Sequence, residues 1–350
     1  MTLSDFRTQL EPLLQETFRS YAQALPPIES AFLQELLNYP SALLQGGKRI
    51  RPYLASIAFT NLGGTLTTEI LRVLSSLEFF HLFCLIHDDI IDEGALRHGI
   101  PTLHTYAKTR LEQEKRLGQA AHLGEAHALL IGDLLFAWSI DLMQSPTVGT
   151  PRSRERVRTL FFQMINEVVI GQLLDVDLTT RSRASSAEIA QKMYLKTAGY
   201  TFVKPLQLGA SLCTSAKPVM RFCERFGTAV GHAFQWQDDL LDLTGDPTKT
   251  KKTCFSDLLT RQQTPFTQHV REQGSKEDVL LLDALLGHPL TEAEQQEARN
   301  LFERTGAFSV GQRGIETALA NAETLLAKAT FLKHPEEFHD LIALLHHRTS

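Results

Sequence analysis

The sequence predicts an all-α protein, and three observations lead to this fold class. Long apolar stretches without internal Gly or Pro cover much of the chain. No stretch alternates strictly between apolar and polar residues, and Gly and Pro gather in a few short segments. Helices need uninterrupted stretches with an apolar face, whereas strands need a two-residue alternation. We therefore expect one helical bundle around a central cavity, with about ten or more helices at typical helix lengths.

Five stretches carry the strongest helical pattern: residues 70–91, 129–143, 157–176, 189–212 and 219–243. Loops are expected where Gly and Pro cluster, at residues 46–52, 94–101, 146–151 and 245–247. Two segments rich in charged or small polar residues are expected at the surface, residues 105–122 and 145–158. No shift in composition divides the chain, so we expect a single domain over residues 1–350.

The composition narrows the class of protein. Hydrophobic residues make up 43% and charged residues 21%, which is typical of a soluble globular protein with a sizeable core. The formal net charge of −5 disfavours a nucleic-acid-binding protein, which usually has a basic excess. The four cysteines have no CxxC spacing and are too few for a disulfide framework.

The location expected from the sequence is the cytoplasm. The N-terminus has no basic segment followed by an apolar one, as a signal peptide would have. The apolar stretch 126–143 is interrupted by Asp133 and Asp141. We therefore expect a buried helix there and no membrane span.

Two acidic clusters of the form DDxxD are the sharpest signal, and each ends an apolar helical stretch. They contain Asp88, Asp89 and Asp92, and Asp238, Asp239 and Asp242. Helical residues four apart lie only about 40° apart around the axis, so the outer carboxylates of each motif share a face. Such carboxylates repel each other unless a cation neutralises them, and magnesium prefers oxygen ligands.

Two such clusters facing each other could hold several ions around a diphosphate that leaves as its C–O bond breaks. A single DDxxD also arises by chance on a solvated helix end, but two copies after apolar helices favour metal binding. We predict a magnesium site built from five carboxylates: Asp88, Asp89, Asp92, Asp238 and Asp242.

Basic residues near these motifs could hold the phosphates. The stretch 46–52 places three cations after a Gly-Gly turn, and further cations are Arg97, Lys196 and Lys252. Arg binds phosphate as a fork and Lys as a point charge. In isolation the 46–52 segment would be a surface turn. His81, two turns before Asp88, would by itself be a core residue, but its place relative to the motif favours a ligand role.

As a set, these motifs resemble the trans-prenyltransferases, the isoprenyl diphosphate synthases that make geranyl, farnesyl and geranylgeranyl diphosphates. The resemblance runs from about residue 46 to residue 257 and rests on GGKRIRP, HxxxxxHDDIID, RHGIPTLH, GDLL, GQLLDVD, KTA, FQxxDDLLD and a following lysine. It implies an all-α homodimer that joins isopentenyl diphosphate head to tail to an allylic diphosphate.

The resemblance also implies a role for each matching residue. Three aspartates would ligate a trinuclear magnesium cluster on the allylic diphosphate: Asp88, Asp92 and Asp238. The same diphosphate would be held by Arg97, Lys196 and Lys252. The diphosphate of isopentenyl diphosphate would be bound by Lys48, Arg51 and His81. The developing allylic cation would lie near Thr197 and Gln235, and the cavity would be lined by Gln172 and Asp175.

The sequence departs from the family pattern at three positions. The family usually has Arg where this chain has His98, which we still expect in the substrate site. It usually has Gly where this chain has Lys251. It usually has Lys where this chain has Gln262, five positions after Asp257. Arg261 or Lys251 could replace the charge that Gln262 removes.

Phe83 is the residue that bears on product length. It lies five residues before Asp88, roughly 7.5 Å deeper along the helix. In the family, two adjacent bulky residues here tend to stop growth at fifteen carbons, whereas one aromatic residue tends to allow twenty. We therefore expect geranylgeranyl diphosphate, with farnesyl diphosphate as the alternative. The other interpretation of Phe83 is simple packing against a neighbouring helix.

Two rival functions are a terpene cyclase and a non-catalytic subunit of a prenyl synthase. Cyclases generally lack the GGKRIRP segment and a second DDxxD motif, and both are present here. Non-catalytic subunits tend to lose the aspartates, and all six are retained. No nucleophile elbow or triad motif is evident, as expected for a reaction that needs no nucleophilic side chain.

Overall fold

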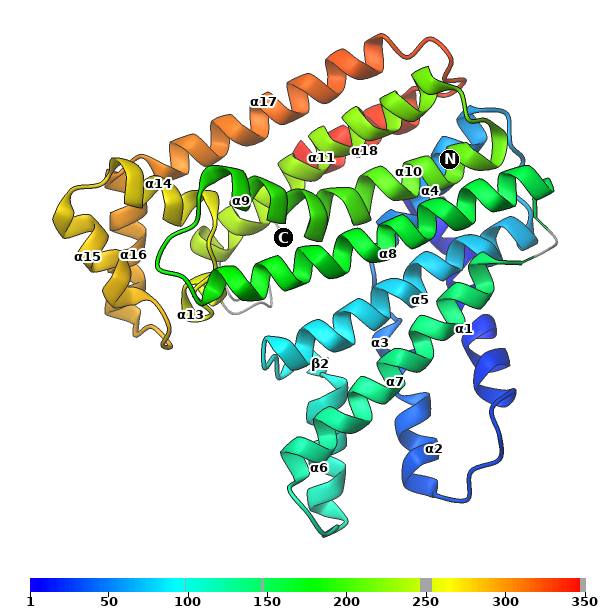
Figure 1. Ribbon diagram of the computed structural model, residues 1–350, viewed down its shortest axis with the longest axis horizontal. Coiled ribbons are helices and arrows are strands. Elements are labelled where there is room, and N and C mark those ends of the chain that lie inside the picture. Colours follow the sequence, from blue (N-terminus) through cyan, green and yellow to red (C-terminus); the bar gives the residue numbers. More distant parts are fainter. Residues whose placement is uncertain (98, 146–147, 246–253, 347–350) are drawn as a thin grey trace. The chain divides into compact units, whose positions relative to one another are not determined.

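The computed structural model describes residues 1–97, 99–145, 148–245 and 254–346. The fold is almost entirely helical, which confirms the predicted all-α class (Figure 1). The described residues form two compact units, residues 1–56 with 64–158 and residues 57–63 with 159–350. The single domain over residues 1–350 stays a prediction.

The first unit is built around two long antiparallel neighbours, α5 (Thr68–Ile91) and α7 (Ala120–Met143), which have extensive contact along their length. Its other elements are α1 (Leu3–Gln23), α2 (Ala31–Asn38), α3 (Pro40–Leu43), α4 (Ile50–Asn61), which ends in the second unit, β1 (Leu96–Arg97), β2 (Ile100–Pro101) and α6 (Leu103–Gln113). The strands pair as a short antiparallel hairpin, where the sequence predicted only a loop. Two residues are too few to show an alternating pattern.

Helix α5 is the core of this unit, and it positions the first acidic motif. The Thr67 hydroxyl caps its N-terminus by accepting a hydrogen bond from the Ile70 amide. The helix ends at Ile91, because Glu93 two residues later has a left-handed backbone with φ 53°. Buried residues lie on almost every face of α5, as its continuous apolar sequence predicts.

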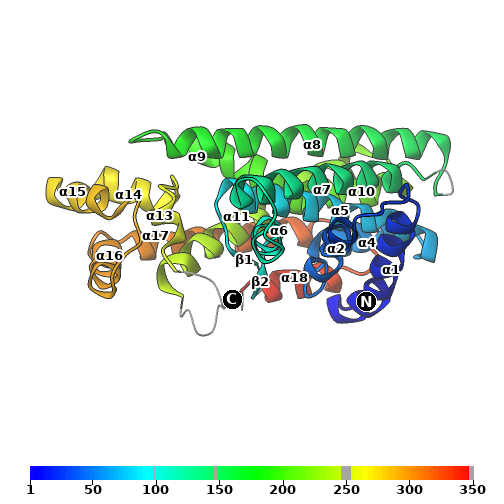
Figure 2. The same ribbon diagram turned by 90° about the horizontal axis from the view of Figure 1, so that it is seen from below.

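The second unit contains the longest helices. Its elements are α8 (Pro151–Thr179), which starts in the first unit, α9 (Ser186–Lys192), the π-helix η1 (Met193–Val203), α10 (Lys204–Cys213), α11 (Lys217–Thr244), α13 (Ser256–Leu259), α14 (Pro265–Gln273), α15 (Lys276–Leu285), α16 (Glu292–Arg304), α17 (Ala307–Ala327) and α18 (Glu336–His346). Within this unit α11 packs against η1 and α17. Figure 2 shows α14, α15 and α16 gathered beside one end of α17.

Glycines let α11 and η1 approach closely. A Cβ atom on Gly231 of α11 would lie 2.5 Å from the Cβ of Ala198, and one on Gly227 would lie 2.8 Å from the Cα of Val203. Real Cβ atoms do not come so close, so both positions need glycine. The contact fixes η1, which carries Lys196 and Thr197, beside the helix that carries the second acidic motif.

Among the described residues, three helices have the length and hydropathy of a membrane span: α5, α7 and α8. In α5, 67% of the most apolar window is buried inside the fold, so packing accounts for its composition. In α8 only 33% of that window is buried, which leaves an apolar face to be explained.

Candidate active site

The first acidic motif lies at the C-terminal end of α5, and its middle residue is neutralised by an arginine. Asp89 is 3% exposed, and Nε of Arg97 donates to both of its carboxylate oxygens over 2.9 Å. Burial raises the pKa of Asp89, although Arg97 acts in the opposite direction. The outer residues are more accessible, since Asp88 is half-buried and Asp92 is exposed. Asp88 and Asp92 are therefore the carboxylates of this motif that can reach a cation most easily.

The hairpin β1–β2 holds Arg97 in this position. Its two strands pair Arg97 with Ile100. The amide of Gly94 donates to the carbonyl of Asp89 over 2.9 Å, and the hydroxyl of Thr102 donates to the carbonyl of Gly94 over 2.7 Å. His98 lies outside the described residues, so its predicted role stays a prediction.

The basic segment before α4 is fixed by Arg49, which the sequence did not single out. Arg49 is buried and forms ion pairs with Glu11 of α1, at 2.9 Å, and with Glu78 of α5, at 2.7 Å. A Cβ atom on Gly47 would overlap the guanidinium group, so that position needs glycine for space. On either side of this anchor lie Lys48, which is exposed, and Arg51, which is half-buried.

Phe83 is half-buried on α5 and contacts other aromatic rings of the first unit. Its ring centroid lies 4.5 Å from that of His87, 4.9 Å from Phe136 of α7 and 5.6 Å from Phe80. Its ring therefore packs on α7 and is only partly covered. His81, two residues earlier on α5, is also half-buried.

The second acidic motif ends α11 and crowds its carboxylates together with Asp257. Burial and repulsion from neighbouring aspartates raise the pKa of Asp239 to about 7 and raise that of Asp257 well above its ordinary value. Asp242 accepts hydrogen bonds from the Ser256 hydroxyl, at 2.6 Å, and from the amides of Ser256 and Asp257, both at 3.0 Å. It thereby caps the short helix α13. Asp238, the fourth carboxylate, is half-buried.

Thr197 and Gln235, predicted as catalytic residues, are in direct contact. The Thr197 hydroxyl donates to Oε1 of Gln235 over 2.6 Å, and Nε2 of Gln235 donates to Asp239 over 2.6 Å. The chain of hydrogen bonds fixes the amide orientation and links η1 to the acidic motif on α11. The structure thus brings together three residues that are up to 42 positions apart in the sequence.

Asp175 of α8 gathers two lysines and a glutamine. Its carboxylate lies 2.5 Å from Nζ of Lys196 and 3.1 Å from Nζ of Lys192, and it accepts a hydrogen bond of 3.4 Å from Gln262. Burial acts to raise the pKa of Asp175, but the two ammonium groups hold it below its ordinary value. The sequence prediction included Lys196 and missed Lys192, whose position one turn before Lys196 was the available signal.

Gln172, one turn before Asp175 on α8, was predicted to line the substrate cavity. Its Nε2 atom is buried and has no hydrogen-bond partner within the described residues. Buried amide nitrogens usually have a partner, so this donor fits a ligand oxygen. Lys251 and Lys252 lie outside the described residues.

The structure also shows which cations lie near Gln262, where the family usually has a positively charged lysine. Arg261 was one candidate to replace that charge. Its guanidinium group lies against Gly287, where a Cβ atom would overlap it. Lys192, whose Nζ lies 3.2 Å from Oε1 of Gln262, is the cation found beside Gln262 itself.

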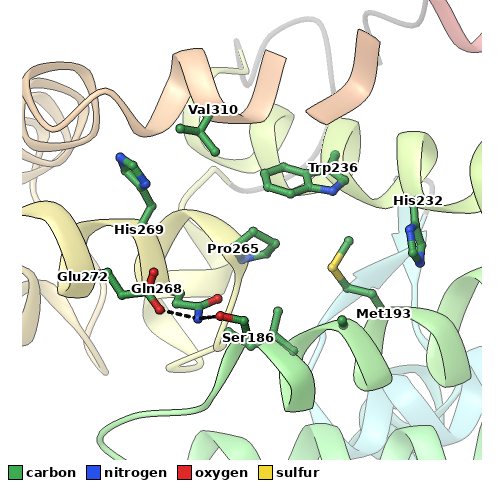
Figure 3. A pocket seen from close by; sticks show the side chains of 11 residues that line it. Ser186, Met193, His232, Trp236, Pro265, Gln268, His269, Glu272 and Val310 are labelled. Carbon is green, nitrogen blue, oxygen red and sulfur yellow. Dashed lines mark hydrogen bonds between the residues drawn. The ribbon is translucent and has the colours of Figure 1, made fainter. Parts of the chain in front are cut away.

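A small pocket in the second unit contains none of the predicted site residues (Figure 3). It has a volume of about 260 Å³ and lies among α9, η1, α11, α14 and α17. Its rim carries a polar bridge in which Gln268 donates to Ser186 and to Glu272, drawn as dashed lines in Figure 3. The volume falls below the roughly 300–1,000 Å³ of ordinary ligand pockets.

The donor set fits magnesium. Both motifs offer carboxylate oxygens alone, and burial, together with repulsion from the neighbouring aspartates, raises the pKa of Asp239 and of Asp257. In the part of the chain that the structure describes, no three His, Cys, Asp or Glu side chains already converge as a ligand set. Magnesium does not require one, because it commonly binds one or two carboxylates and completes its shell with water and substrate phosphates.

Comparison with known proteins identifies the family. The family model of polyprenyl synthetases matches residues 31–303. The chain belongs to the polyprenyl synthetase family. It is therefore a prenyltransferase, as the sequence motifs predicted.

Individual members of the family are similar over most of the chain. A geranylfarnesyl diphosphate synthase of Natronomonas pharaonis is 30% identical over 75% of each chain. A geranylgeranyl diphosphate synthase of Methanosarcina mazei is 29% identical over 67% of this chain and 66% of its own. A solved geranylgeranyl pyrophosphate synthase of Corynebacterium glutamicum, complexed with isoprenyl diphosphate and magnesium, has a TM-score of 0.89 at 26% identity and covers 99% of this chain and 100% of its own.

Proposed function

We propose that this polyprenyl synthetase condenses isopentenyl diphosphate head to tail with an allylic diphosphate, depends on magnesium, and releases geranylgeranyl diphosphate as its main product. The observation that carries this function is the group of four carboxylates on α11 and α13, which interact electrostatically with one another and with Lys192. Carboxylates that a divalent cation would neutralise, close to a lysine, are complementary to a magnesium diphosphate. The similar geranylfarnesyl and geranylgeranyl diphosphate synthases support the same substrate class.

Asp88, Asp92 and Asp238 are the proposed ligands of three magnesium ions, with Asp89 and Asp242 next to them. When bound, magnesium neutralises the allylic diphosphate as it departs. Arg97, Lys196 and Lys252 hold that diphosphate. Lys48, Arg51, His81 and His98 hold the diphosphate of isopentenyl diphosphate, so that its double bond faces the allylic carbon.

Thr197 and Gln235 stabilise the developing allylic cation by their oriented dipoles. Because the Gln235 amide donates to Asp239, its Oε1 carries partial negative charge on the side where Thr197 lies. A fixed dipole needs no reorganisation when the charge develops. The proton lost from the product goes to the released diphosphate, so no side chain has to act as a dedicated base.

The first test is a condensation assay with labelled isopentenyl diphosphate and each allylic primer, with products identified by chromatography. Turnover is expected with magnesium and none with a chelator. Asp88→Ala and Asp238→Ala should each lower kcat by several orders of magnitude, because a metal-held charge is worth several kcal/mol. Asp283→Ala, on the surface of α15, is the control and should keep parental turnover.

The same assay separates the alternatives. Farnesyl diphosphate as the main product would replace the proposed product length, and a cyclic hydrocarbon would indicate a terpene cyclase. No product with any primer would indicate a non-catalytic subunit. Near-normal turnover of Asp88→Ala would contradict the proposed metal site.

The proposed assembly is a homodimer, and the apolar face of α8 supports it. Five large apolar side chains of α8 are exposed and spaced along one helical stripe: Phe162, Val169, Ile170, Leu173 and Val176. Such a contiguous apolar stripe on a helix is typical of a protein–protein contact. A cytoplasmic location and the lack of a membrane span stay predictions from the sequence.

A further inference from the structure

Lys192 uses all three of its ammonium protons inside the second unit. Its Nζ atom lies 3.1 Å from Oδ1 of Asp175, donates to the carbonyl of Gln263 over 2.8 Å and donates to Oε1 of Gln262 over 3.2 Å. An ammonium group has three donors, so each has an acceptor. Its side chain is only 11% exposed, against 26% for that of Lys196.

The two lysines share one carboxylate, and this changes what Lys196 can do. Lys196 contacts Oδ2 of Asp175, and Lys192 contacts Oδ1. Asp175 alone therefore balances only one of the two ammonium charges. Because Lys192 holds one oxygen of this carboxylate, Asp175 binds Lys196, the more exposed of the two, less strongly than it would bind a single lysine.

Gln262 is the residue that makes this arrangement possible. Its amide oxygen accepts from Lys192, and its amide nitrogen donates to Asp175 over 3.4 Å. Only a side chain with both a donor and an acceptor can bridge an ammonium group and a carboxylate in this way. A lysine at position 262 would instead bring a third ammonium group to the Asp175 carboxylate, where it would be repelled by those of Lys192 and Lys196.

We infer that Lys192 is a positioning residue of the allylic diphosphate site: with Gln262 as its bridge, it binds one oxygen of the Asp175 carboxylate and so weakens the hold of Asp175 on Lys196, the lysine proposed to bind the diphosphate. This role rests on the proposed function. Without Lys192, Asp175 and Lys196 form a closed one-to-one pair in which Lys196 has less charge to offer an incoming anion. Lys192 itself does not touch the substrate.

The segment after α13 gives Lys192 its rigidity. Gln263 is buried, and its Nε2 atom donates to the carbonyl of Arg181 over 3.0 Å. The amide of Gln262 donates to the carbonyl of Asp257 over 2.7 Å. These bonds hold residues 262 and 263 in place without Lys192. A lysine introduced at position 262 could therefore contact Asp175 when Lys192 is absent.

The test is a double-mutant cycle of Lys192→Met, Gln262→Lys and the two together. Lys192→Met should raise the KM for the allylic diphosphate by about tenfold, with a smaller change in kcat and none in the KM for isopentenyl diphosphate. Gln262→Lys alone should lower Tm, because three ammonium groups then meet at Asp175. The double variant should return both the allylic KM and Tm towards the parental values, since the lysine at 262 takes the place of Lys192.

A binding readout makes the result independent of turnover. Calorimetric titration with inorganic pyrophosphate and magnesium should show the same loss in Lys192→Met and the same recovery in the double variant. Lys204→Met is the matched control. Lys204 is equally buried and pairs with Glu167 at 2.8 Å, so its loss should lower Tm and leave pyrophosphate affinity unchanged.

The outcomes separate the possible failures. If Lys192→Met lowers Tm as Lys204→Met does but keeps the pyrophosphate affinity and allylic KM of the parent, Lys192 is only structural and the inference is wrong. If Gln262→Lys has the same effect in both backgrounds, the two residues do not act together, and the inference is again wrong. If the parent has no condensation activity with any primer, the proposed function fails, and the pyrophosphate titrations still decide the role of Lys192.

Discussion

At the scale of single residues, Phe83 packs on one side only, and this bears on its proposed role in product length. The ring contacts His87, Phe80 and Phe136, yet it remains half-exposed. A fully packed core ring would have no surface to offer a substrate, and a fully exposed one would have no support. In the proposed function, Phe83 is supported from one side by these rings and forms the floor for the growing prenyl chain with the other.

Replacing this ring should lengthen the product. Phe83→Ala removes the floor, so we expect products longer by one or more five-carbon units with turnover largely retained, measured by chromatography of the dephosphorylated products. Phe79→Ala is the control, because Phe79 is fully buried on the same helix and packs on Phe18. That variant should lose about 3–5 kcal/mol of unfolding free energy with the product unchanged. An unchanged product in Phe83→Ala would leave packing as the only role of the ring.

Residues of the candidate site could be predicted where they belong to a repeated motif. They could not be predicted where their role depends on a contact with residues far away in the sequence. The two DDxxD motifs stand out because the same pattern occurs twice after apolar helices. Arg49 does not stand out, because it lies between two other cations and nothing in the sequence shows that Glu11 and Glu78 meet it. Lys192 likewise looks like an ordinary surface lysine in the sequence, and only the fold brings it into contact with Asp175.

At the scale of elements, the contact between α8 and η1 sets the position of Lys196. A Cβ atom on Gly171 of α8 would lie 2.5 Å from the backbone nitrogen of Lys196. The two backbones can therefore touch only at a glycine. The π-helical geometry of η1 adds to this, since π-helical segments place side chains in directions that an α-helix does not offer and occur often at functional sites.

Gly171→Ala should therefore impair the site more than the fold. The added methyl group has to push η1 and Lys196 away from α8, and overpacking of this kind costs about 1–3 kcal/mol of unfolding free energy. We expect a lower kcat/KM for the allylic substrate and a lower Tm. Gly227→Ala is the matched control at the other end of η1, where the methyl group meets Val203. It should lower Tm by a similar amount and keep the allylic KM; equal kinetic losses in both variants would contradict the role of Gly171.

The long helices were predictable because each combines a continuous apolar pattern with Gly or Pro at its ends. The stretch expected at 219–243 is α11, Lys217–Thr244, and that expected at 70–91 is α5, Thr68–Ile91. The π-helix was not predictable. The expected single helix over 189–212 divides into α9, η1 and α10, because a change in backbone hydrogen bonding leaves the apolar pattern of the sequence unaltered.

At the scale of the whole molecule, the exposed stripe of α8 is the feature that still needs a partner. The chain has the hydropathy of a globular protein, yet Ile170 of α8 is 52% exposed and Leu173 is 61% exposed. A second copy of the chain covers this stripe in the proposed homodimer. The family and the fold class could be predicted from the sequence, whereas this stripe required the structure, since the sequence of α8 alone does not show which apolar side chains are buried.

Ile170→Glu should convert the proposed dimer to a monomer. A charge placed in an apolar contact has to be buried without a partner, which is costly. Sedimentation velocity should show half the parental mass. Leu280→Glu is the control, because Leu280 is an exposed apolar residue of α15, outside the proposed interface. This change should leave the sedimenting mass unaltered. A parental protein that sediments as a monomer, or an Ile170→Glu variant that stays dimeric, would contradict this interface.

The ion pairs of Arg49 set a minimum length for any shortened form of the protein. The family match begins at residue 31, and Glu11 precedes it by about three turns of α1 and a loop. A chain trimmed to the matched region would lose Glu11 and with it the acceptor for two of the guanidinium nitrogens of Arg49, which stays buried beside Glu78. The folded protein therefore needs more of the N-terminus than the family match covers, because the charge of Arg49 has to be balanced. An N-terminal deletion should first displace the neighbours of Arg49, Lys48 and Arg51.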